Sequence, residues 1–233
     1  MQDGITAEPK LDGSPVTAAD KKCEAVIAAT LKAAFPDDGL FGEEGANAES
    51  RNGRRWIIDP IDGTRDYLRG TPLWANLIGL EADGEIVAGV VNLPMLGEMY
   101  VASKGGGAFR NGLPIHASHI ASFAESVICV NGLSRGAFPF RDHLLARIQE
   151  FWAFRCLGGA PDAMLVASGR AELWIESKAA PWDLAPLKIV IEEAGGRFFD
   201  YAGKSTIYSG HCIACAPALE GKVRRFLEGS PPG

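Results

Sequence analysis

The 233-residue sequence contains no run of about 18 consecutive apolar residues, which excludes an ordinary membrane-spanning helix. Its first residues also lack the basic start and apolar middle of a signal peptide. Basic residues are in the minority, since 23 Lys and Arg against 29 Asp and Glu give a net charge of −6. No basic stripe is present to meet the phosphates of a nucleic acid. We therefore expect a cytoplasmic protein that binds neither membranes nor nucleic acids.

Cysteine is also scarce, with five scattered residues, and an odd number fits a reducing compartment better than a disulfide framework. Cys212 and Cys215 have the C-x-x-C spacing of a zinc site, but no second pair exists. An extended backbone would also send their sulfurs to opposite faces. His116 and His119 lie in a polar stretch and are predicted to be at the surface. We expect ordinary buried thiols rather than zinc ligands.

Turn-forming residues, in contrast, are abundant, with 28 Gly and 14 Pro and no repeat. Residues 1–16 are predicted to form a loop or hairpin, and residues 37–54 a loop. Thr17 and Asp20 have the spacing of a capping box, which predicts a helix that continues to Phe35. The apolar face expected for this helix consists of Val26, Ile27, Thr30, Leu31 and Ala34.

Two patterns of secondary structure follow one another along the chain. A short strand is predicted from Arg55 to Ile58, ending at Asp59. A meander of strands follows at 74–80, 86–92 and 99–102, with a turn at Asp83-Gly84. Beyond residue 120, strands at 126–130, 173–176, 197–199 and 212–216 alternate with helices at 141–150, 162–168, 183–194 and 218–228.

This order predicts an α+β lobe with the meander over residues 1–120, followed by an α/β lobe over residues 121–233 that completes the site. No G-x-G-x-x-G motif follows a strand and opens a helix. The sequence therefore does not support a dinucleotide-binding domain.

The most informative segment is Trp-Ile-Ile-Asp-Pro-Ile-Asp-Gly-Thr at positions 56–64. Asp59 and Asp62 follow an apolar strand, where ligands of α/β folds collect. Two carboxylates this close repel each other unless one is protonated or a cation lies between them, and oxygen ligands favour Mg²⁺ over zinc. Gly63 and Thr64 form a plausible helix entry whose free N–H groups attract phosphate. The alternative is that both acids merely cap a turn and a helix.

Further acids occur in two other segments. Glu43 and Glu44 lie in a glycine-framed loop before the strand, and Asp183 lies at a predicted helix start. Two of the candidate acids have a simpler explanation. Asp183 fits a helix N-cap, and Asp20 fits the capping box described above. The metal-site hypothesis therefore rests on their joint occurrence.

Together these motifs resemble the inositol monophosphatase-like superfamily: Gly42-Glu43-Glu44, the 56–64 segment, Trp182-Asp183 with Gly195-Gly196, and the 10–20 segment. The resemblance covers nearly the whole chain in order. It implies a Mg²⁺-dependent, Li⁺-sensitive phosphomonoesterase with a layered α-β-α-β-α sandwich that is usually dimeric. Family members usually carry about one more helix before this start, so we expect the first helix of the fold to be missing here.

Within the superfamily, segments 66–78 and 165–172 resemble histidinol-phosphate phosphatases of the inositol-monophosphatase type. The leading hypothesis is therefore hydrolysis of histidinol phosphate to histidinol, a step of histidine biosynthesis. One alternative is an inositol 1-phosphatase or a broader sugar or nucleotide phosphatase. Another is a non-catalytic relative that binds a phosphorylated ligand.

The resemblance also implies roles for particular residues. Asp20 and Thr64 would orient and deprotonate the attacking water, and Asp20 with Glu43 would assist a third, weakly held Mg²⁺. The main metal ligands would be Glu43, Asp59 and the carbonyl of Ile61 for one ion, and Asp59, Asp62 and Asp183 for the second.

Substrate contacts are implied in the same way. Glu176, seven residues before Asp183, would bind a substrate hydroxyl or ammonium; the alternative is an acid that faces water. Gly159 stands where the family usually has Ser or Thr, and Asp162 is a candidate to compensate. Tyr67 and Trp74 would stack on an imidazole, unless they belong to the core. The full substrate-binding set is Asp62, Gly63, Thr64, Gly158, Gly159, Ala160, Glu176 and Asp183.

Overall fold

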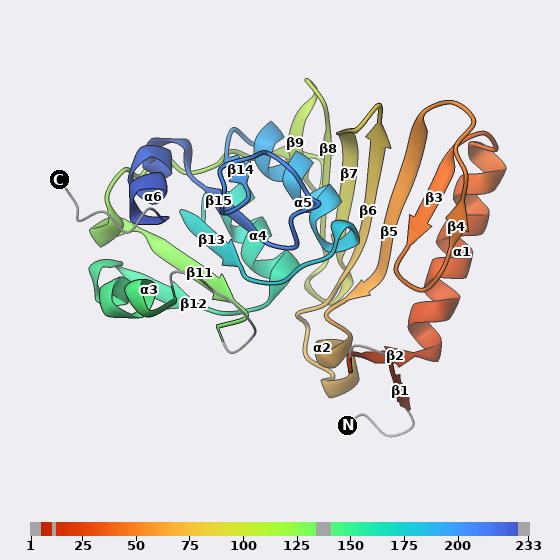
Figure 1. Ribbon diagram of the computed structural model, residues 1–233, viewed down its shortest axis with the longest axis horizontal. Coiled ribbons are helices and arrows are strands. Elements are labelled where there is room, and N and C mark those ends of the chain that lie inside the picture. The colour runs from red at the N-terminus through yellow and green to blue at the C-terminus, as the bar shows by residue number, and fades with distance from the viewer. Residues whose placement is uncertain (1–5, 11–12, 134–140, 228–233) are drawn as a thin grey trace.

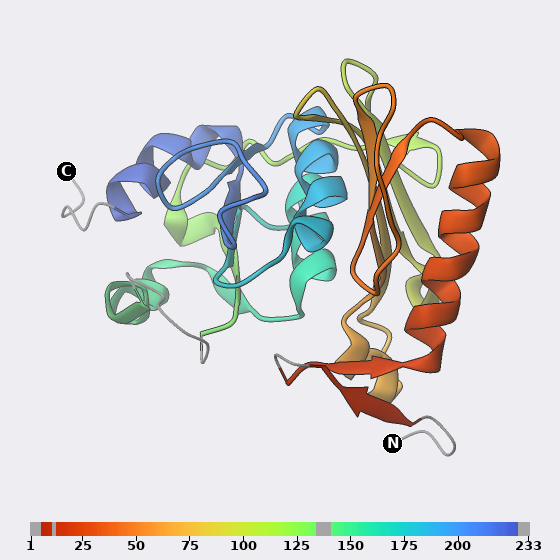
Figure 2. The same ribbon diagram turned by 45° about the vertical axis from the view of Figure 1, so that its right-hand side comes forward.

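The computed structural model describes residues 6–10, 13–133 and 141–227, which form five layers (Figures 1 and 2). One helix covers the outer face of an eight-stranded sheet, two helices lie between this sheet and a five-stranded sheet, and two more lie beyond. The expected layered α-β-α-β-α sandwich is confirmed. In layer order the helices are α1 (Ala18–Ala34), then α4 (Gly159–Ala167) with α5 (Pro181–Glu193), then α3 (Arg141–Arg147) with α6 (Glu220–Leu227).

The short elements complete the chain. A hairpin precedes α1, the helix α2 follows β5, and several single turns are of 3-10 type. None of the helices in the described ranges is long and apolar enough to cross a membrane. The short elements are β1 (Ala7–Pro9), β2 (Pro15–Thr17), α2 (Thr64–Arg69) and the 3-10 turns Pro94–Leu96, Phe123–Glu125, Ile148–Glu150 and Pro217–Leu219.

The eight-stranded sheet has the order β10-β9-β8-β7-β6-β5-β3-β4 and contains the predicted antiparallel meander. Its turn at Asp83-Gly84 has positive φ at both residues, 51° and 81°. The prediction of a loop over 37–54 was wrong in part, because β3 pairs in parallel with β5 and β4 pairs with β3. The strands are β3 (Gly39–Gly42), β4 (Asn47–Ala48), β5 (Arg54–Asp62), β6 (Ala75–Ala82), β7 (Glu85–Leu93), β8 (Glu98–Ser103), β9 (Gly107–Arg110) and β10 (Leu113–Pro114).

The five-stranded sheet has the order β12-β11-β13-β15-β14. Cys212 packs among residues of α4 and α5, whereas Cys215 packs against α6 on the other face, and both are fully buried. The interpretation of these cysteines as core thiols is confirmed. The strands are β11 (Val127–Asn131), β12 (Ala153–Arg155), β13 (Leu173–Glu176), β14 (Arg197–Phe199) and β15 (Cys212–Cys215); β12, a three-residue edge strand, was not predicted.

Helix α1 begins at the predicted capping box. The Thr17 hydroxyl accepts hydrogen bonds from the amides of Ala19 and Asp20, and Asp20 Oδ2 accepts one from the Thr17 amide at 2.8 Å. The last helical residue is Ala34, just before the predicted end. Local sequence alone therefore determines both ends of this helix.

The buried face of α1 differs from the prediction, because it carries charge. Val26 is 66% exposed and Thr30 is also exposed, whereas Glu24 is buried. The carboxylate of Glu24 accepts the amides of Glu44 at 2.8 Å and Ala46 at 2.7 Å. These bonds satisfy the buried charge, so the helix holds the acidic loop after β3 in place.

Two glycines let α5 lie directly on the meander. A Cβ atom at Gly89 would lie 2.6 Å from Ile189 Cγ2 and 2.8 Å from the Cα atom of Pro186. A Cβ atom at Gly79 would lie 2.8 Å from Ala185 Cβ. Real Cβ atoms do not approach this closely. Glycine at both positions therefore sets how closely α5 packs on the sheet, and with it the position of Asp183 in the first turn of α5.

We expect Gly89→Ala to destabilise the protein by about 2–3 kcal/mol, because the backbone of α5 would have to move away from the sheet. Urea unfolding measures the change. Gly221→Ala in α6 is the control, since no atom lies closer than 3.7 Å to its Cβ, and it should be neutral or stabilising by about 0.5 kcal/mol. Equal stability of the two variants would contradict the close packing.

Candidate active site

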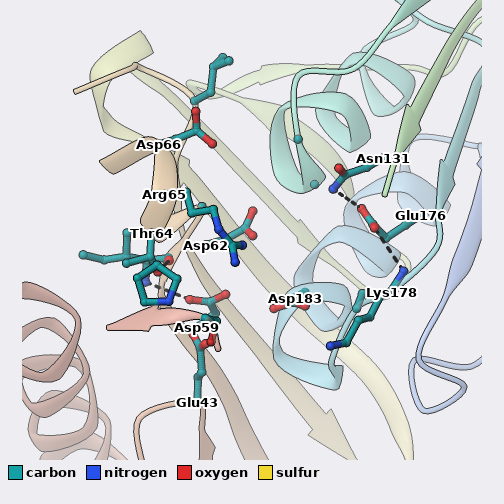
Figure 3. Close-up of a pocket in the computed structure, with 18 residues that line it drawn as sticks. Glu43, Asp59, Asp62, Thr64, Arg65, Asp66, Asn131, Glu176, Lys178 and Asp183 are labelled. Atoms are coloured by element: carbon teal, nitrogen blue, oxygen red, sulfur yellow. Dashed lines mark hydrogen bonds between the residues drawn. The ribbon is translucent and has the colours of Figure 1, made fainter. Parts of the chain in front are cut away.

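An acid-lined cavity lies between the two sheets, where the end of β5 meets α2, the end of β13 and the start of α5 (Figure 3). Its volume is about 230 Å³. Two basic side chains, Arg65 and Lys178, enter it. Six acids line it, namely Glu43, Asp59, Asp62, Asp66, Glu176 and Asp183.

Strand β5 delivers two of these acids. It continues to Asp62 instead of ending at Asp59 as predicted, and its pairing with β6 is irregular between these two residues. The amide of Ile61 donates to Asp59 Oδ1 at 2.9 Å, which fixes the carboxylate within this irregular stretch. The irregularity explains how acids three positions apart, which would alternate across a regular strand, serve one cavity.

The central feature is a cluster of three carboxylates from β5 and α5. One oxygen from each of Asp59, Asp62 and Asp183 lies within 4.8 Å of the others. Asp62 Oδ2 also accepts the Ala160 amide at 3.1 Å, and Asp183 Oδ2 accepts the Ala180 amide at 2.7 Å. The backbone therefore orients the acids while the charges remain close together.

This closeness perturbs the acidity of all three groups. Burial and the charges of Glu43, Asp183 and Asp62 raise the pKa of Asp59 well above its usual value. Burial raises the pKa of Asp62 to about 6, although the Ala160 amide opposes the shift. Burial and the charge of Asp62 raise the pKa of Asp183 to about 7. A divalent cation among the three would favour the ionised carboxylates and so oppose these shifts.

Glu43 adjoins this cluster from the loop after β3. Its charge raises the pKa of Asp59, and its amide donates to the Ile58 carbonyl at 3.1 Å. Lys10 Nζ donates to Glu43 Oε1 at 2.7 Å and to Glu44 Oε1 at 2.5 Å. Glu43 lines the cavity, whereas Glu44 does not.

The predicted water-activating pair is in contact. Thr64 Oγ1 donates to Asp20 Oδ1 at 3.2 Å, and it also lies 3.3 Å from the Ile61 carbonyl. Asp20 is fully buried behind Thr64, and its other oxygen accepts the Thr17 hydroxyl and amide. The capping box of α1 therefore also holds Asp20 toward the cavity, so the structural and the chemical interpretation of Asp20 are compatible.

The predicted substrate loop is present, with one residue engaged elsewhere. Gly158 and Gly159 line the cavity, but the Ala160 amide is occupied by Asp62. Asp162 does not line the cavity; it accepts the amides of Leu157 and Gly158. Its expected role in replacing the missing hydroxyl at position 159 is therefore wrong, because its carboxylate is used to close the loop.

The aromatic pair proposed for stacking lies beside the cavity. Tyr67 and Trp74 contact each other edge to face with ring centroids 5.2 Å apart, and neither lines the cavity. Their mutual packing favours a structural role over direct stacking on a substrate.

Glu176 enters the cavity from the end of β13. It pairs in register with Asn131 of β11, whose Nδ2 donates to Glu176 Oε2 at 2.7 Å. Burial raises the pKa of Glu176 to about 8, although the hydrogen bond from Asn131 lowers it. A neutral acid of this kind can donate to a hydroxyl, and a cationic ligand would favour its ionised form.

The lining side chains that were not predicted include Arg65, Asp66, Lys178 and Asn131, and their sequence signals differ. Arg65 and Asp66 directly follow the motif, and Lys178 follows Glu176 by two positions, so adjacency alone pointed to them. Asn131 had no local signal, because only the pairing of β11 with β13 places it beside Glu176.

The acid cluster fits magnesium rather than a softer metal. Its donors are carboxylate oxygens, and Ile61, whose carbonyl is a predicted ligand, also lines the cavity. Among the described residues, no cysteine or histidine lines this cavity. Hard divalent cations prefer such oxygen sets.

Comparisons with known proteins find related phosphatases. The sequence model of the inositol monophosphatase family matches residues 2–228. A histidinol-phosphatase of Chlorobaculum parvum is 43% identical over 214 residues, covering 91% of this chain and 83% of that protein. An inositol-1-monophosphatase of Mesorhizobium japonicum is 37% identical over 208 residues, covering 87% and 78%. The structure of a Thermotoga maritima IMPase superposes with a TM-score of 0.88 at 30% identity, covering 96% and 87%.

Proposed function

We propose that this chain, which belongs to the inositol monophosphatase family, is a Mg²⁺-dependent phosphomonoesterase with a preference for histidinol phosphate. The family and its named relatives indicate a phosphatase. The observation that carries the proposal is the convergence of Asp59, Asp62 and Asp183 on one cavity. The similarity to a histidinol-phosphatase supports the choice of substrate.

The acids of the cavity would hold two or three Mg²⁺ ions, through the residues already assigned from the resemblance: Glu43, Asp59, Ile61, Asp62 and Asp183. When bound, the cations would lower the pKa of a water molecule and offset the charge of the phosphoryl oxygens. The same ligand set supports inhibition by Li⁺. We also propose that the protein forms a homodimer.

The chain itself would supply the proton path for the attacking water. Thr64 donates its hydroxyl proton to Asp20, so the lone pairs of Thr64 Oγ1 can accept a hydrogen bond from the water. As the water gives its proton to Thr64 Oγ1, the Thr64 hydroxyl proton would pass to Asp20, whose carboxylate is fixed by Thr17. The N–H groups of Gly63 and Thr64 would orient the phosphoryl group for in-line attack.

Glu176 would select the alcohol part of the substrate. Its carboxyl group lies across the cavity from Asp62 and is fixed by Asn131 (Figure 3). With histidinol phosphate it would face the ammonium group, and the favourable charge interaction would ionise the acid. With an inositol phosphate it would instead bind a ring hydroxyl, which is why the inositol-1-monophosphatase similarity makes that activity the second candidate.

A panel of phosphomonoesters assayed with and without Mg²⁺ tests the proposal. We expect kcat/KM for histidinol phosphate to exceed that for inositol 1-phosphate by about tenfold or more, since an ammonium–carboxylate contact adds over 1 kcal/mol. Glu176→Gln should reduce this ratio. A higher kcat/KM for inositol 1-phosphate would reverse the order of the candidates, and no turnover of any ester would support a non-catalytic binding protein.

A further inference from the structure

Two basic side chains lie in the acidic cavity without an acidic partner. Arg65 projects from α2, and Lys178 projects from the loop after β13 on the opposite wall (Figure 3). Six carboxylates line the same space. Within the described residues, neither cation forms an ion pair or a side-chain hydrogen bond.

The carboxylates closest to Arg65 in sequence are engaged elsewhere. Asp62 accepts the Ala160 amide and converges with Asp59 and Asp183. Asp66, the next residue of α2, accepts the Thr71 hydroxyl at 2.6 Å. The Arg65 guanidinium, which is exposed on the cavity side of α2, is therefore left available for a ligand (Figure 3).

A guanidinium has a particular ligand preference. Its planar donors match two oxygens of a carboxylate or phosphate group, and it stays charged at any working pH. The proposed function places a phosphoryl group beside Thr64, the neighbour of Arg65. The remaining cation, Lys178, enters from the side of Glu176, where the alcohol part of the substrate would lie.

We propose that Arg65 is a phosphate-binding residue of this site, which contacts the phosphoryl oxygens through its guanidinium. This inference rests on the proposed function for the identity of the ligand. It adds a side-chain contact to the backbone and metal contacts that the family resemblance implies.

The test is binding of inorganic phosphate in the presence of Mg²⁺, measured by calorimetry, together with steady-state kinetics on histidinol phosphate. We expect Arg65→Gln to raise the Kd of phosphate and the KM of the substrate by about tenfold each, because a charge-assisted contact is lost. The kcat should change less than about threefold, and Arg65→Lys should recover part of the loss. Mg²⁺ binding and the melting temperature should stay unchanged.

Two controls separate this contact from general charge. Arg69→Gln removes a cation from the same helix outside the cavity and should change nothing. Lys178→Gln removes the same charge from the opposite wall and should raise the Kd of phosphate by less than about threefold. Equal effects of Arg65→Gln and Lys178→Gln, or a Kd for Arg65→Gln within twofold of the parent, would overturn the inference.

The two proposals fail in distinguishable ways. If the parent hydrolyses no ester but Arg65→Gln still weakens phosphate binding, the proposed function fails and the role of Arg65 stands. If the parent is active and Arg65→Gln binds phosphate as the parent does, only the role of Arg65 fails. If the parent binds no phosphate with Mg²⁺ present, the role of Arg65 is refuted as well.

Discussion

Replacing Asp59 by Asn is expected to lower turnover of every phosphomonoester by about 10³-fold or more, equivalent to about 4 kcal/mol of transition-state stabilisation. Burial and the charges of Glu43, Asp183 and Asp62 raise the pKa of Asp59 well above its usual value, and its carboxylate converges with those of Asp62 and Asp183. Asn keeps the oxygen that accepts the Ile61 amide but removes the charge needed for a cation. The kinetics are measured at saturating Mg²⁺.

The same substitution should stabilise the metal-free protein. Because the folded protein raises the pKa of Asp59, its ionised form is unfavourable at pH 8 without a cation. Removing that charge should raise the free energy of unfolding in EDTA, while abolishing most of the stabilisation by Mg²⁺. A gain in stability with a loss of activity is the signature of a functional rather than a structural acid.

Asp200→Asn is the matched control, an equally isosteric change at a buried acid outside the cavity. Burial would raise the pKa of Asp200, but hydrogen bonds from Ser209 and the amides of Lys204 and Ala202 outweigh it and lower the pKa. The charge of Asp200 therefore stabilises the fold, and its loss should lower stability at pH 8 and leave kcat intact. If Asp59→Asn behaved like Asp200→Asn, the cluster would be structural.

Sequence reasoning succeeds here where the signal is local. The capping box at Thr17 and the limits of the strand Leu173–Glu176 follow from adjacent residues, and both are confirmed. Strands β3, β4 and β12 were missed because each is two to four residues long and depends on a partner elsewhere in the chain. The division of the chain at residue 120 stays a prediction.

The site shows the same limit. Acids recognised by motif, such as Asp59 and Asp183, converge as expected because the motifs encode the chemistry directly. The buried role of Glu24 was invisible, since an acid within an amphipathic pattern normally faces water, and only the amides of the loop after β3 explain its burial. Asn131 likewise depends on strand register. Side chains that support the acids therefore need the tertiary structure.

A second large effect is expected when pH and Mg²⁺ are varied together. In the metal-free protein the pKa values of Asp62, about 6, and Asp183, about 7, lie above the value of about 4 for the unfolded chain. The folded state then binds more protons than the unfolded state between these values. The contribution of both groups to the free energy of unfolding is therefore present in full below pH 4. It is lost as the pH rises through 6 and 7.

The metal-free protein should therefore lose about 2–4 kcal/mol from these groups between pH 5 and pH 8, a fall of about 5–10 °C in melting temperature. Cation binding requires the ionised acids, so it competes with protons and should tighten by up to about tenfold per pH unit for each proton displaced.

Melting curves in EDTA and in Mg²⁺ at both pH values measure the two trends. Stabilisation by Mg²⁺ should be small at pH 5 and large at pH 8, and in Asp183→Asn both trends should shrink. Stabilisation by Mg²⁺ of equal size at both pH values would mean that the cation binds away from Asp62 and Asp183. A cation that displaces the protons of these acids must stabilise the protein more at pH 8 than at pH 5.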